Sequence, residues 1–176
     1  LITDKRFEQY VNLFADKNFF LSPNFKIVIT PIVAFSHSLS VLHFLKNCIL
    51  TFFQVILIFL KTRPKIVVGF GSYVSFFPLF VALISFRSII LHEQNVIFGK
   101  VNRIFSPFAK SILLSFPDIS FISEKFYSKI KHKIIISGFP SFIFDGKNKG
   151  VSPGKVIYDL ATKDEIIILI TGGGQG

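Results

Sequence analysis

Short runs of consecutive apolar residues alternate along this chain with longer helical patterns, and this alternation limits the possible folds more than any other feature. Polar residues do not alternate with apolar ones inside the runs, so both faces of each predicted strand are expected to be buried. Buried strands that alternate with helices are typical of an α/β domain built on a doubly wound parallel sheet. The runs that predict strands are Phe25–Thr30, Lys65–Val68, Ser88–Leu91, Ser111–Leu114 and Lys133–Ile136.

The predicted helices lie between these strands. Near the start of the chain, Thr3 or Asp4 is a suitable cap for a helix whose apolar residues recur at helical spacing, namely Phe7, Tyr10, Val11 and Phe14. A longer apolar helix is expected from about Ser38 to Leu60, with Asn47 as the point where it would break. Another helix is expected from Lys100 to Ala109.

The composition changes after residue 139, where polar and turn-forming residues replace the apolar runs. We therefore expect residues 1–139 to form one domain, residues 140–153 to be a linker, and residues 154–176 to begin a second α/β domain. In that second unit a helix is expected at about Gly154–Ala161 and a strand at Glu165–Thr171. Because the chain contains no Met and ends in a glycine loop with no helix after it, we expect it to be cut at both ends.

The charge is strongly positive and unevenly distributed. The 20 Lys and Arg residues outnumber the 10 Asp and Glu residues, which gives a net charge of +10, and no acidic residue lies between Asp16 and Glu93. Basic side chains set among long apolar runs suit an anionic membrane surface better than nucleic acid, which would require polar and stacking groups beside the charges. The pattern predicts a peripheral protein that binds anionic membrane lipids and no nucleic acid.

A membrane-spanning segment is the alternative. The stretch from Ile66 to Phe86 has no charged residue and is long enough to cross a bilayer. However, its β-branched residues stop at Gly69 and Gly71, and Pro78 follows, so the stretch is better interpreted as a strand, a turn and the start of a helix. The single Cys48 and the lack of a signal-peptide pattern favour a reducing, cytoplasmic setting.

Unusual loops follow predicted strands at three places. In an open parallel sheet, ligands bind beyond the carboxyl ends of the strands, where helix amino termini and free backbone amides are presented. If the sheets are parallel, all three loops are expected to face one cleft. The loops are Gly69–Ser75, His92–Asn95 and Gly172–Gly176.

Each loop also has a simpler interpretation. Glycines after a strand commonly make only a tight turn. The first loop also imitates a dinucleotide-binding motif, with Glu93 as its ribose-binding acid, but Val74 stands where the third glycine would be needed. Four adjacent polar side chains at the end of an apolar strand must find partners or solvent, so His92–Asn95 is the strongest predictor of a site. The remaining histidines are scattered without Cys or carboxylate neighbours, which predicts no metal site, and no cofactor is expected.

In this order and spacing the loops resemble the MurG family, the N-acetylglucosaminyltransferases that complete the lipid-linked peptidoglycan precursor. The likeness extends from Ile2 to Gly176 and rests mainly on the intact His-Glu-Gln-Asn string. The matching segments are Val68–Ser75, Leu91–Asn95, the helix Lys100–Ala109 with its Asn102, Ser137–Pro140 and Gly172–Gly176.

The resemblance implies two Rossmann-like domains of the GT-B type. The first would face the lipid acceptor, a muramyl-pentapeptide linked to undecaprenyl diphosphate, and the second would bind UDP-N-acetylglucosamine. The implied reaction is an inverting, metal-independent attack of the muramyl 4-hydroxyl on the anomeric carbon of the donor, on the cytoplasmic face of the plasma membrane. Its implied catalytic candidates are His92, Glu93 and Tyr73. Its implied substrate-binding residues are Asn95, Gln94, Gly71, Ser72, Gly172, Gly173, Gly174 and Gln175.

The chain departs from the family pattern at several positions. The glycine-rich loop that opens the family's first domain would precede Leu1. The usual Gly-Asn-Pro-Val-Arg is replaced here by a sequence with Phe139 and Phe142, and Gly174 and Ser72 replace a serine and a glycine. Phe76 and Phe77 replace a smaller pair. These departures keep open a different class of function, a non-catalytic, membrane-associated α/β remnant, and we expect the piece by itself to be inactive.

Overall fold

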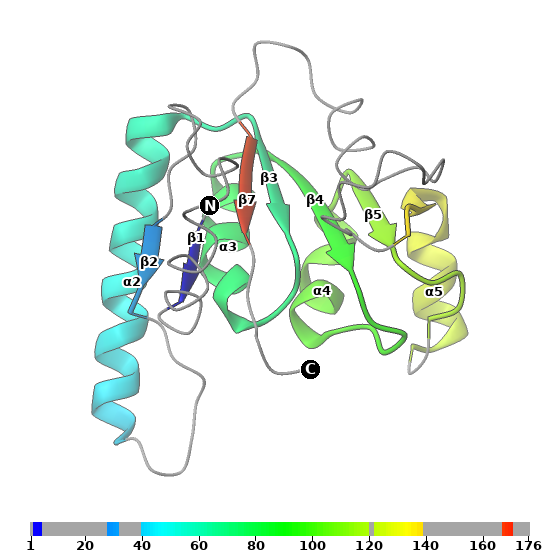
Figure 1. Ribbon diagram of the computed structural model, residues 1–176, viewed down its shortest axis with the longest axis horizontal. Coiled ribbons are helices and arrows are strands. Elements are labelled where there is room, and N and C mark those ends of the chain that lie inside the picture. Colours follow the sequence, from blue (N-terminus) through cyan, green and yellow to red (C-terminus); the bar gives the residue numbers. More distant parts are fainter. Residues whose placement is uncertain (1, 5–27, 32–39, 120–121, 139–166, 171–176) are drawn as a thin grey trace, which may run out of the picture.

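The computed structural model describes residues 2–4, 28–31, 40–119, 122–138 and 167–170 (Figure 1). Several predictions therefore lie outside the described residues. These are the helix expected around residues 7–14, the linker at 140–153, the helix expected at Gly154–Ala161 and the last loop with Gly172, Gly173, Gly174 and Gln175.

The described residues form a seven-stranded sheet in which every neighbouring pair of strands is parallel. The order across the sheet is β2-β1-β7-β3-β4-β5-β6, and helices cover it (Figure 1). The predicted α/β fold with a parallel sheet is confirmed. The strands are β1 Ile2–Asp4, β2 Val28–Thr30, β3 Ile66–Gly69, β4 Ser88–Glu93, β5 Ser111–Leu114, β6 Ile134–Ile136 and β7 Ile167–Ile170.

The last strand is not where the sequence predicted it. We expected the segment around Ile167–Ile170 to start a second domain, but β7 lies in the same sheet, between β1 and β3. There it pairs along its full length with β3, from Ile66 opposite Ile167 to Gly69 opposite Ile170. Strands β1 and β3 would otherwise leave a row of backbone groups unpaired in the middle of the sheet, and a parallel apolar strand satisfies them. The division at residues 140–153 stays a prediction.

The helices are α2 Val41–Thr62, α3 Phe76–Ile84, α4 Lys100–Phe105 and α5 Glu124–Ile130, with short 3-10 turns at Tyr73–Ser75, Ser106–Phe108 and Lys131–Lys133. The break expected near Asn47 is wrong, because α2 is continuous from the Ser40 cap, whose Oγ accepts from the backbone N–H of His43. A single Asn has only a weak preference against helix, and the apolar turns on both sides outweigh it. The strand, turn and helix predicted between Ile66 and Phe86 are confirmed as β3, a 3-10 turn and α3.

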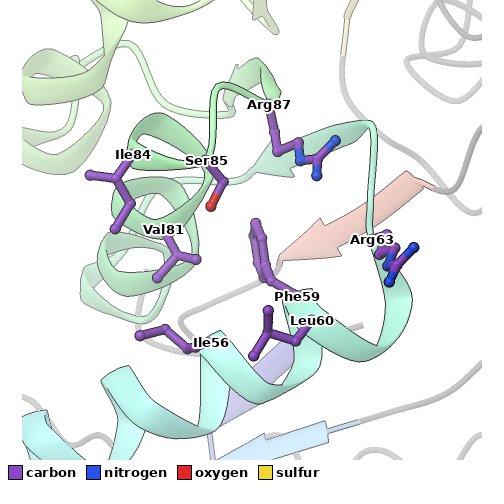
Figure 2. A pocket seen from close by; sticks show the side chains of 8 residues that line it. All are labelled: Ile56, Phe59, Leu60, Arg63, Val81, Ile84, Ser85 and Arg87. Carbon is purple, nitrogen blue, oxygen red and sulfur yellow. The ribbon is translucent and has the colours of Figure 1, made fainter.

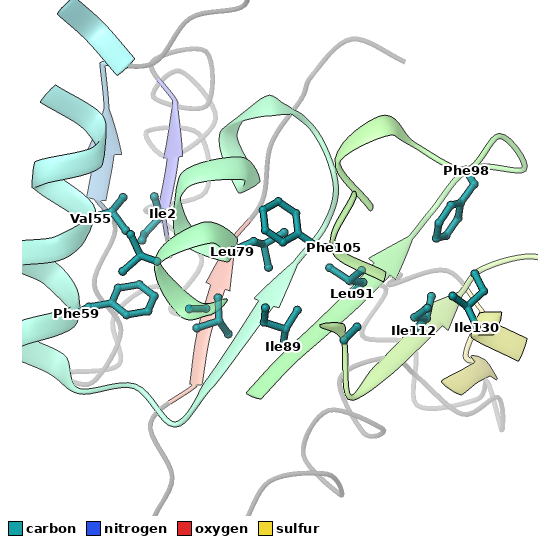
Figure 3. Close-up of a cluster of buried hydrophobic side chains, with 14 of the residues drawn as sticks. Ile2, Val55, Phe59, Leu79, Ile89, Leu91, Phe98, Phe105, Ile112 and Ile130 are labelled. Carbon is teal, nitrogen blue, oxygen red and sulfur yellow. The ribbon is translucent and has the colours of Figure 1, made fainter. Parts of the chain in front are cut away.

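One face of the sheet carries the hydrophobic core (Figure 3). Alternate strand residues point to it, and side chains from all four helices cover them. The approach of α3 is close, because a Cβ added at Gly69 would lie 2.9 Å from Cδ1 of Leu79. The core members on the sheet are Val67, Ile89, Leu91, Ile112 and Leu114, and those on the helices include Val55, Phe59, Leu79, Val81, Ala82, Phe105 and Ile130.

Truncation of Leu79 tests this core. Leu79 is fully buried against the sheet, so Leu79→Ala is expected to lower the free energy of unfolding by about 2–5 kcal/mol, through lost apolar contact and the cavity left behind. Urea unfolding followed by circular dichroism measures this change. Leu42→Ala is the matched control because Leu42, on α2, is 80% exposed; equal losses in the two variants would contradict the described core.

Candidate functional site

Two of the three predicted loops leave the sheet at the same edge. Strands β3 and β4 are parallel neighbours, with Gly69 opposite Leu91, so their carboxyl ends lie side by side. The loops are also joined directly, because Nε2 of Gln94 donates to the backbone oxygen of Phe70 over 3.1 Å. The prediction that the loops bearing Tyr73 and Asn95 share one edge is confirmed.

The loop after β6 reaches the same edge. The backbone N–H groups of Ser137 and Gly138 both donate to the carbonyl oxygen of Leu114, at the end of β5, over 2.9 and 3.2 Å. Oγ of Ser115 then donates to the carbonyl oxygen of Gly138 over 3.3 Å. We call this edge, formed by the loops after β3, β4, β5 and β6, the carboxyl rim.

Glu93 is the centre of the hydrogen bonding at the carboxyl rim. It is the last residue of β4 rather than a loop residue, and its side chain is buried. Oε1 accepts from the backbone N–H and Nδ2 of Asn95 over 3.1 and 3.3 Å, and Oε2 accepts from the N–H of Gly99 and Nδ2 of Asn102 over 2.9 Å each. Because both oxygens are directed into the loop, the carboxylate shapes residues 94–99 and does not face a ribose, which argues against the dinucleotide-binding alternative.

Asn102 contacts both the loop after β3 and the end of β4. It is a buried residue of α4, and its Nδ2 donates to the carbonyl oxygen of His92 over 3.1 Å as well as to Glu93. It also lies against Gly71, where an added Cβ would be 3.3 Å from Nδ2. Gly71 has a φ of +71°, so both its conformation and the space above Asn102 favour glycine.

Asn102 was not among the predicted site residues, although the family pattern included it. The sequence signal for it is an amide at helical spacing from apolar residues: Phe98, just before α4, and Phe105, in its last turn, lie four residues before and three after Asn102, and all three are buried. A buried amide in such a position must have hydrogen-bond partners, and here they are His92 and Glu93.

His92 lies within β4, on the face opposite Glu93, and is fully buried. Its ring packs beside Phe70, with 5.1 Å between ring centroids. Burial lowers the pKa of His92 below its usual 6.5, while the Gly138 backbone, the Gln94 side chain and the charge of Glu93 act in the opposite direction. Among the described residues neither ring nitrogen has a hydrogen bond of normal geometry, although the Gly138 backbone and the Gln94 side chain lie close enough to act on the pKa of the ring. The lowered pKa favours a neutral ring that keeps one donor and one acceptor for a ligand or water.

Buried polar atoms without a hydrogen-bond partner among the described residues occur on both sides of this end of β4. Besides both ring nitrogens of His92, they include Oε1 of Gln94 and Oδ1 of Asn102. Most buried polar atoms in proteins have a partner, so such a group marks a place where a polar ligand or water binds. Asn95, next to Gln94 in the same loop, is exposed to solvent.

The turn after β3 contains a conformation that is unusual for its residue. Ser72 has a φ of +63°, a region that glycine adopts freely and serine rarely, and it occupies the position where the resembled family has glycine. The next residues, Tyr73–Ser75, form a 3-10 turn in which the Ser75 hydroxyl donates to the carbonyl oxygen of Gly71. Tyr73 is half-buried at the rim. Ser72 thus takes a glycine-like backbone conformation at this position.

No group of three or more His, Cys, Asp or Glu side chains is placed to hold a metal ion within the described residues.

A parallel sheet with glycine turns and unpartnered polar atoms at its carboxyl edge defines a Rossmann-like α/β domain, a class of fold in which ligands commonly bind at that edge. The chain belongs to glycosyltransferase family 28, whose N-terminal domain model matches residues 1–114. The resemblance to MurG is confirmed by curated relatives, each bearing the name UDP-N-acetylglucosamine–N-acetylmuramyl-(pentapeptide) pyrophosphoryl-undecaprenol N-acetylglucosamine transferase.

Among these relatives, the Wolbachia protein from Brugia malayi is 35% identical over 74% of this chain, and the Anaplasma marginale protein is 31% identical over the whole of it. The chain spans 32% and 44% of the lengths of these two relatives. The crystal structure of Acinetobacter baumannii MurG has the same fold, with a TM-score of 0.53 at 22% identity, over 70% of this chain and 34% of that one.

Removal of the Asn102 amide tests the network under the rim. Asn102→Ala leaves Glu93 and the His92 carbonyl without one donor each, so the free energy of unfolding is expected to fall by about 1–3 kcal/mol. Amide hydrogen exchange of residues 93–99 is expected to accelerate. Asn95→Ala removes one part-buried hydrogen bond to the same carboxylate and is the control; a loss as large in that variant would refute the central place of Asn102.

The buried ring of His92 predicts a pH dependence of stability. Because its pKa is lowered in the folded state, the unfolded chain binds a proton that the folded chain does not, and stability falls as the pH drops below about 6.5. His92→Gln removes this contribution, so unfolding free energies measured between about pH 7 and about pH 5 should depend less on pH, by at most about 1.4 kcal/mol per pH unit. His132→Gln is the control, since its side chain is exposed; an unchanged slope in His92→Gln would disprove the assignment.

Proposed function

We propose that the complete protein transfers N-acetylglucosamine from UDP-N-acetylglucosamine to the muramyl-pentapeptide linked to undecaprenyl diphosphate. The relatives carry this activity in their names. The observation in this chain that supports it most is the set of unpartnered polar atoms around His92, at the rim where a Rossmann-like sheet binds ligands. Residues 1–114 match the N-terminal domain of the family, so we assign the rim to the acceptor side.

The proposed reaction is an inverting displacement without a metal ion. A bond forms between the muramyl 4-oxygen and the anomeric carbon of the donor, the bond from that carbon to UDP breaks, and the hydroxyl proton passes to a base. Asn95 is exposed at the rim and is our choice for direct contact with a sugar. Glu93 is committed to four hydrogen bonds, so it acts by holding Asn95 in place. Tyr73 remains a candidate for contact or proton transfer.

Two further roles are proposed. His92 is buried, and as a neutral ring it holds the polar end of the site together with Gln94. The backbone amides of Gly172, Gly173, Gly174 and Gln175 would neutralise the charge that develops on the departing diphosphate. Gly71 and Ser72 shape the turn beside the substrate.

The alternative is a non-catalytic remnant with the same fold. Phe139, Phe142 and Gly174 stand where the resembled family has other residues, and Ser72 takes a glycine-like conformation. Phe139 and Phe142 replace an Asn and an Arg of the family pattern, so an amide and a guanidinium expected near the donor are missing. The transfer experiment below separates the two functions.

Transfer of labelled N-acetylglucosamine from the UDP-sugar to the lipid-linked acceptor by the complete protein is the decisive test. Asn95→Ala is expected to lower kcat/KM at least about tenfold, since a well-placed polar contact to a reacting sugar contributes about that much. Lys110→Gln, an exposed change before β5, is the matched control and should retain the activity. No transfer by the unsubstituted protein would favour the remnant.

We further propose that α2 docks the protein on the cytoplasmic face of the plasma membrane. Among the described residues, α2 is the helix that is long and apolar enough to cross a membrane by length and composition. Yet its Val55 and Phe59 are buried in the core of the domain, so a spanning position would remove them from the sheet. The helix is better suited to lie along the surface of the bilayer with its other face inserted. That face has exposed apolar residues along its whole length: Val41, Leu42, Leu45, Ile49, Phe53, Leu57 and Leu60.

Flotation with vesicles tests this docking. At low salt the chain is expected to float with vesicles that contain anionic lipid, and Phe53→Asp with Leu57→Asp should abolish flotation because charges then replace the inserted side chains. Ile104→Asp with Phe108→Asp is the matched control, since these apolar residues are about equally exposed on another part of the domain. A chain that stays at the bottom with anionic vesicles at low salt would disprove docking.

A further inference from the structure

A cavity of about 530 Å³ lies at the edge of the sheet opposite the carboxyl rim. It opens between the carboxyl ends of α2 and α3, which end shortly before the strands β3 and β4 begin (Figure 2). Its walls come from the last turns of the two helices and the residues that follow them. The lining residues are Ile56, Phe59, Leu60, Arg63, Val81, Ile84, Ser85 and Arg87.

The cavity has an apolar part and a cationic part. Phe59 and Val81 form its buried floor, while Leu60, 68% exposed, and Ile84, 50% exposed, stand at its mouth. The guanidinium groups of Arg63 and Arg87 both lie at the other side of the opening (Figure 2). A ligand that fills this cavity therefore needs a hydrocarbon part next to an anionic group.

No described side chain neutralises the two arginines. Among the described residues neither guanidinium has an ion-pair or hydrogen-bond partner, and the sequence holds no acid between Asp16 and Glu93. Their backbones are fixed, because the N–H of Arg63 donates to Phe59 and that of Arg87 to Ala82. The two helix ends contribute about half a negative charge each, so two full positive charges leave the mouth net cationic. The Ser85 hydroxyl is a further donor beside them.

We propose that this cavity binds one anionic phospholipid, with an acyl chain against the apolar floor and the phosphate between Arg63 and Arg87. The apolar part of the mouth continues into the exposed side of α2 through Leu60 and Leu57, and Phe86, 96% exposed, lies between the lining residues Ser85 and Arg87 in the sequence. The cavity thus opens onto the surface that the proposed docking places in the membrane, and the inference rests on that docking. A free phosphate or a nucleotide would leave the apolar part unfilled.

A water-soluble lipid separates this site from general adsorption to a bilayer. The full chain is titrated with dihexanoyl-phosphatidylglycerol below its micelle-forming concentration, and binding is followed by calorimetry. We expect saturable binding at one site per chain, and binding of dihexanoyl-phosphatidylcholine at least about tenfold weaker, since its phosphate carries a compensating cation. Equal binding of the two lipids, or no saturation, would overturn the proposal.

Two cavity variants test which residues bind the phosphate and which bind the acyl chain of the lipid. Arg63→Gln with Arg87→Gln is expected to weaken phosphatidylglycerol binding at least about tenfold, whereas Lys110→Gln with Lys125→Gln removes the same charge from exposed positions elsewhere and should not. Ile84→Trp fills the mouth while keeping it apolar, so it should lose the soluble lipid and retain flotation with anionic vesicles. Unchanged lipid binding in either cavity variant contradicts the site, and circular dichroism confirms that the variants fold.

The same measurements distinguish failure of the cavity proposal from failure of the docking proposal on which it rests. Flotation without saturable binding of the soluble lipid overturns the cavity and leaves docking through α2 in place. Saturable binding without flotation overturns docking and supports the cavity. Inorganic phosphate that competes at the same concentration as the lipid would show that the arginines alone bind, and this too overturns the proposal.

Discussion

The parallel pairing of β3 with β4 is the constraint on which the rest of this structure depends. Because the two strands run side by side in the same direction, the turn after Gly69 and the segment after Glu93 leave the sheet together. Helices α2 and α3 return to the opposite edge for the same reason, since each must end before the next strand begins. One ladder of backbone hydrogen bonds thus places a polar rim at one edge of the sheet and a cationic, apolar cavity at the other.

Glu93 and Asn102 convert this edge into an ordered site. The Glu93 carboxylate at the end of a strand accepts hydrogen bonds from the Asn102 amide of the following helix and from the Gly99 backbone, and these bonds close the intervening loop. Gly71, which has no side chain, lets the turn after β3 lie close to the Asn102 amide. The order of the site therefore comes from buried hydrogen bonds beneath it, while Asn95 remains exposed. In our proposal, the residues that order the site and the residue that contacts its ligand are therefore different members of one short motif.

The long helix α2 has two faces with different partners. Val55 and Phe59 join the core, and the opposite face presents apolar side chains that no described element covers. A free apolar face of this length is unfavourable in water, and an interface with lipid removes that penalty. The cationic mouth beside Arg63 and Arg87 adds charge where lipid phosphates would lie. Our two proposals for this region, docking and a lipid cavity, follow from the same helix but from different residues.

The amino-acid sequence by itself determined the class of fold, because runs such as Ser111–Leu114 can only be strands buried on both faces, and it located the His92–Asn95 motif because polar groups after such a strand need partners. It did not determine that Glu93 faces inward, that Asn102 is its partner, or that Ile167–Ile170 completes the sheet between β1 and β3. Only the tertiary structure decided these, since hydrogen-bond partners and strand neighbours are set by which segments meet in space, and local patterns carry no record of such long-range pairing.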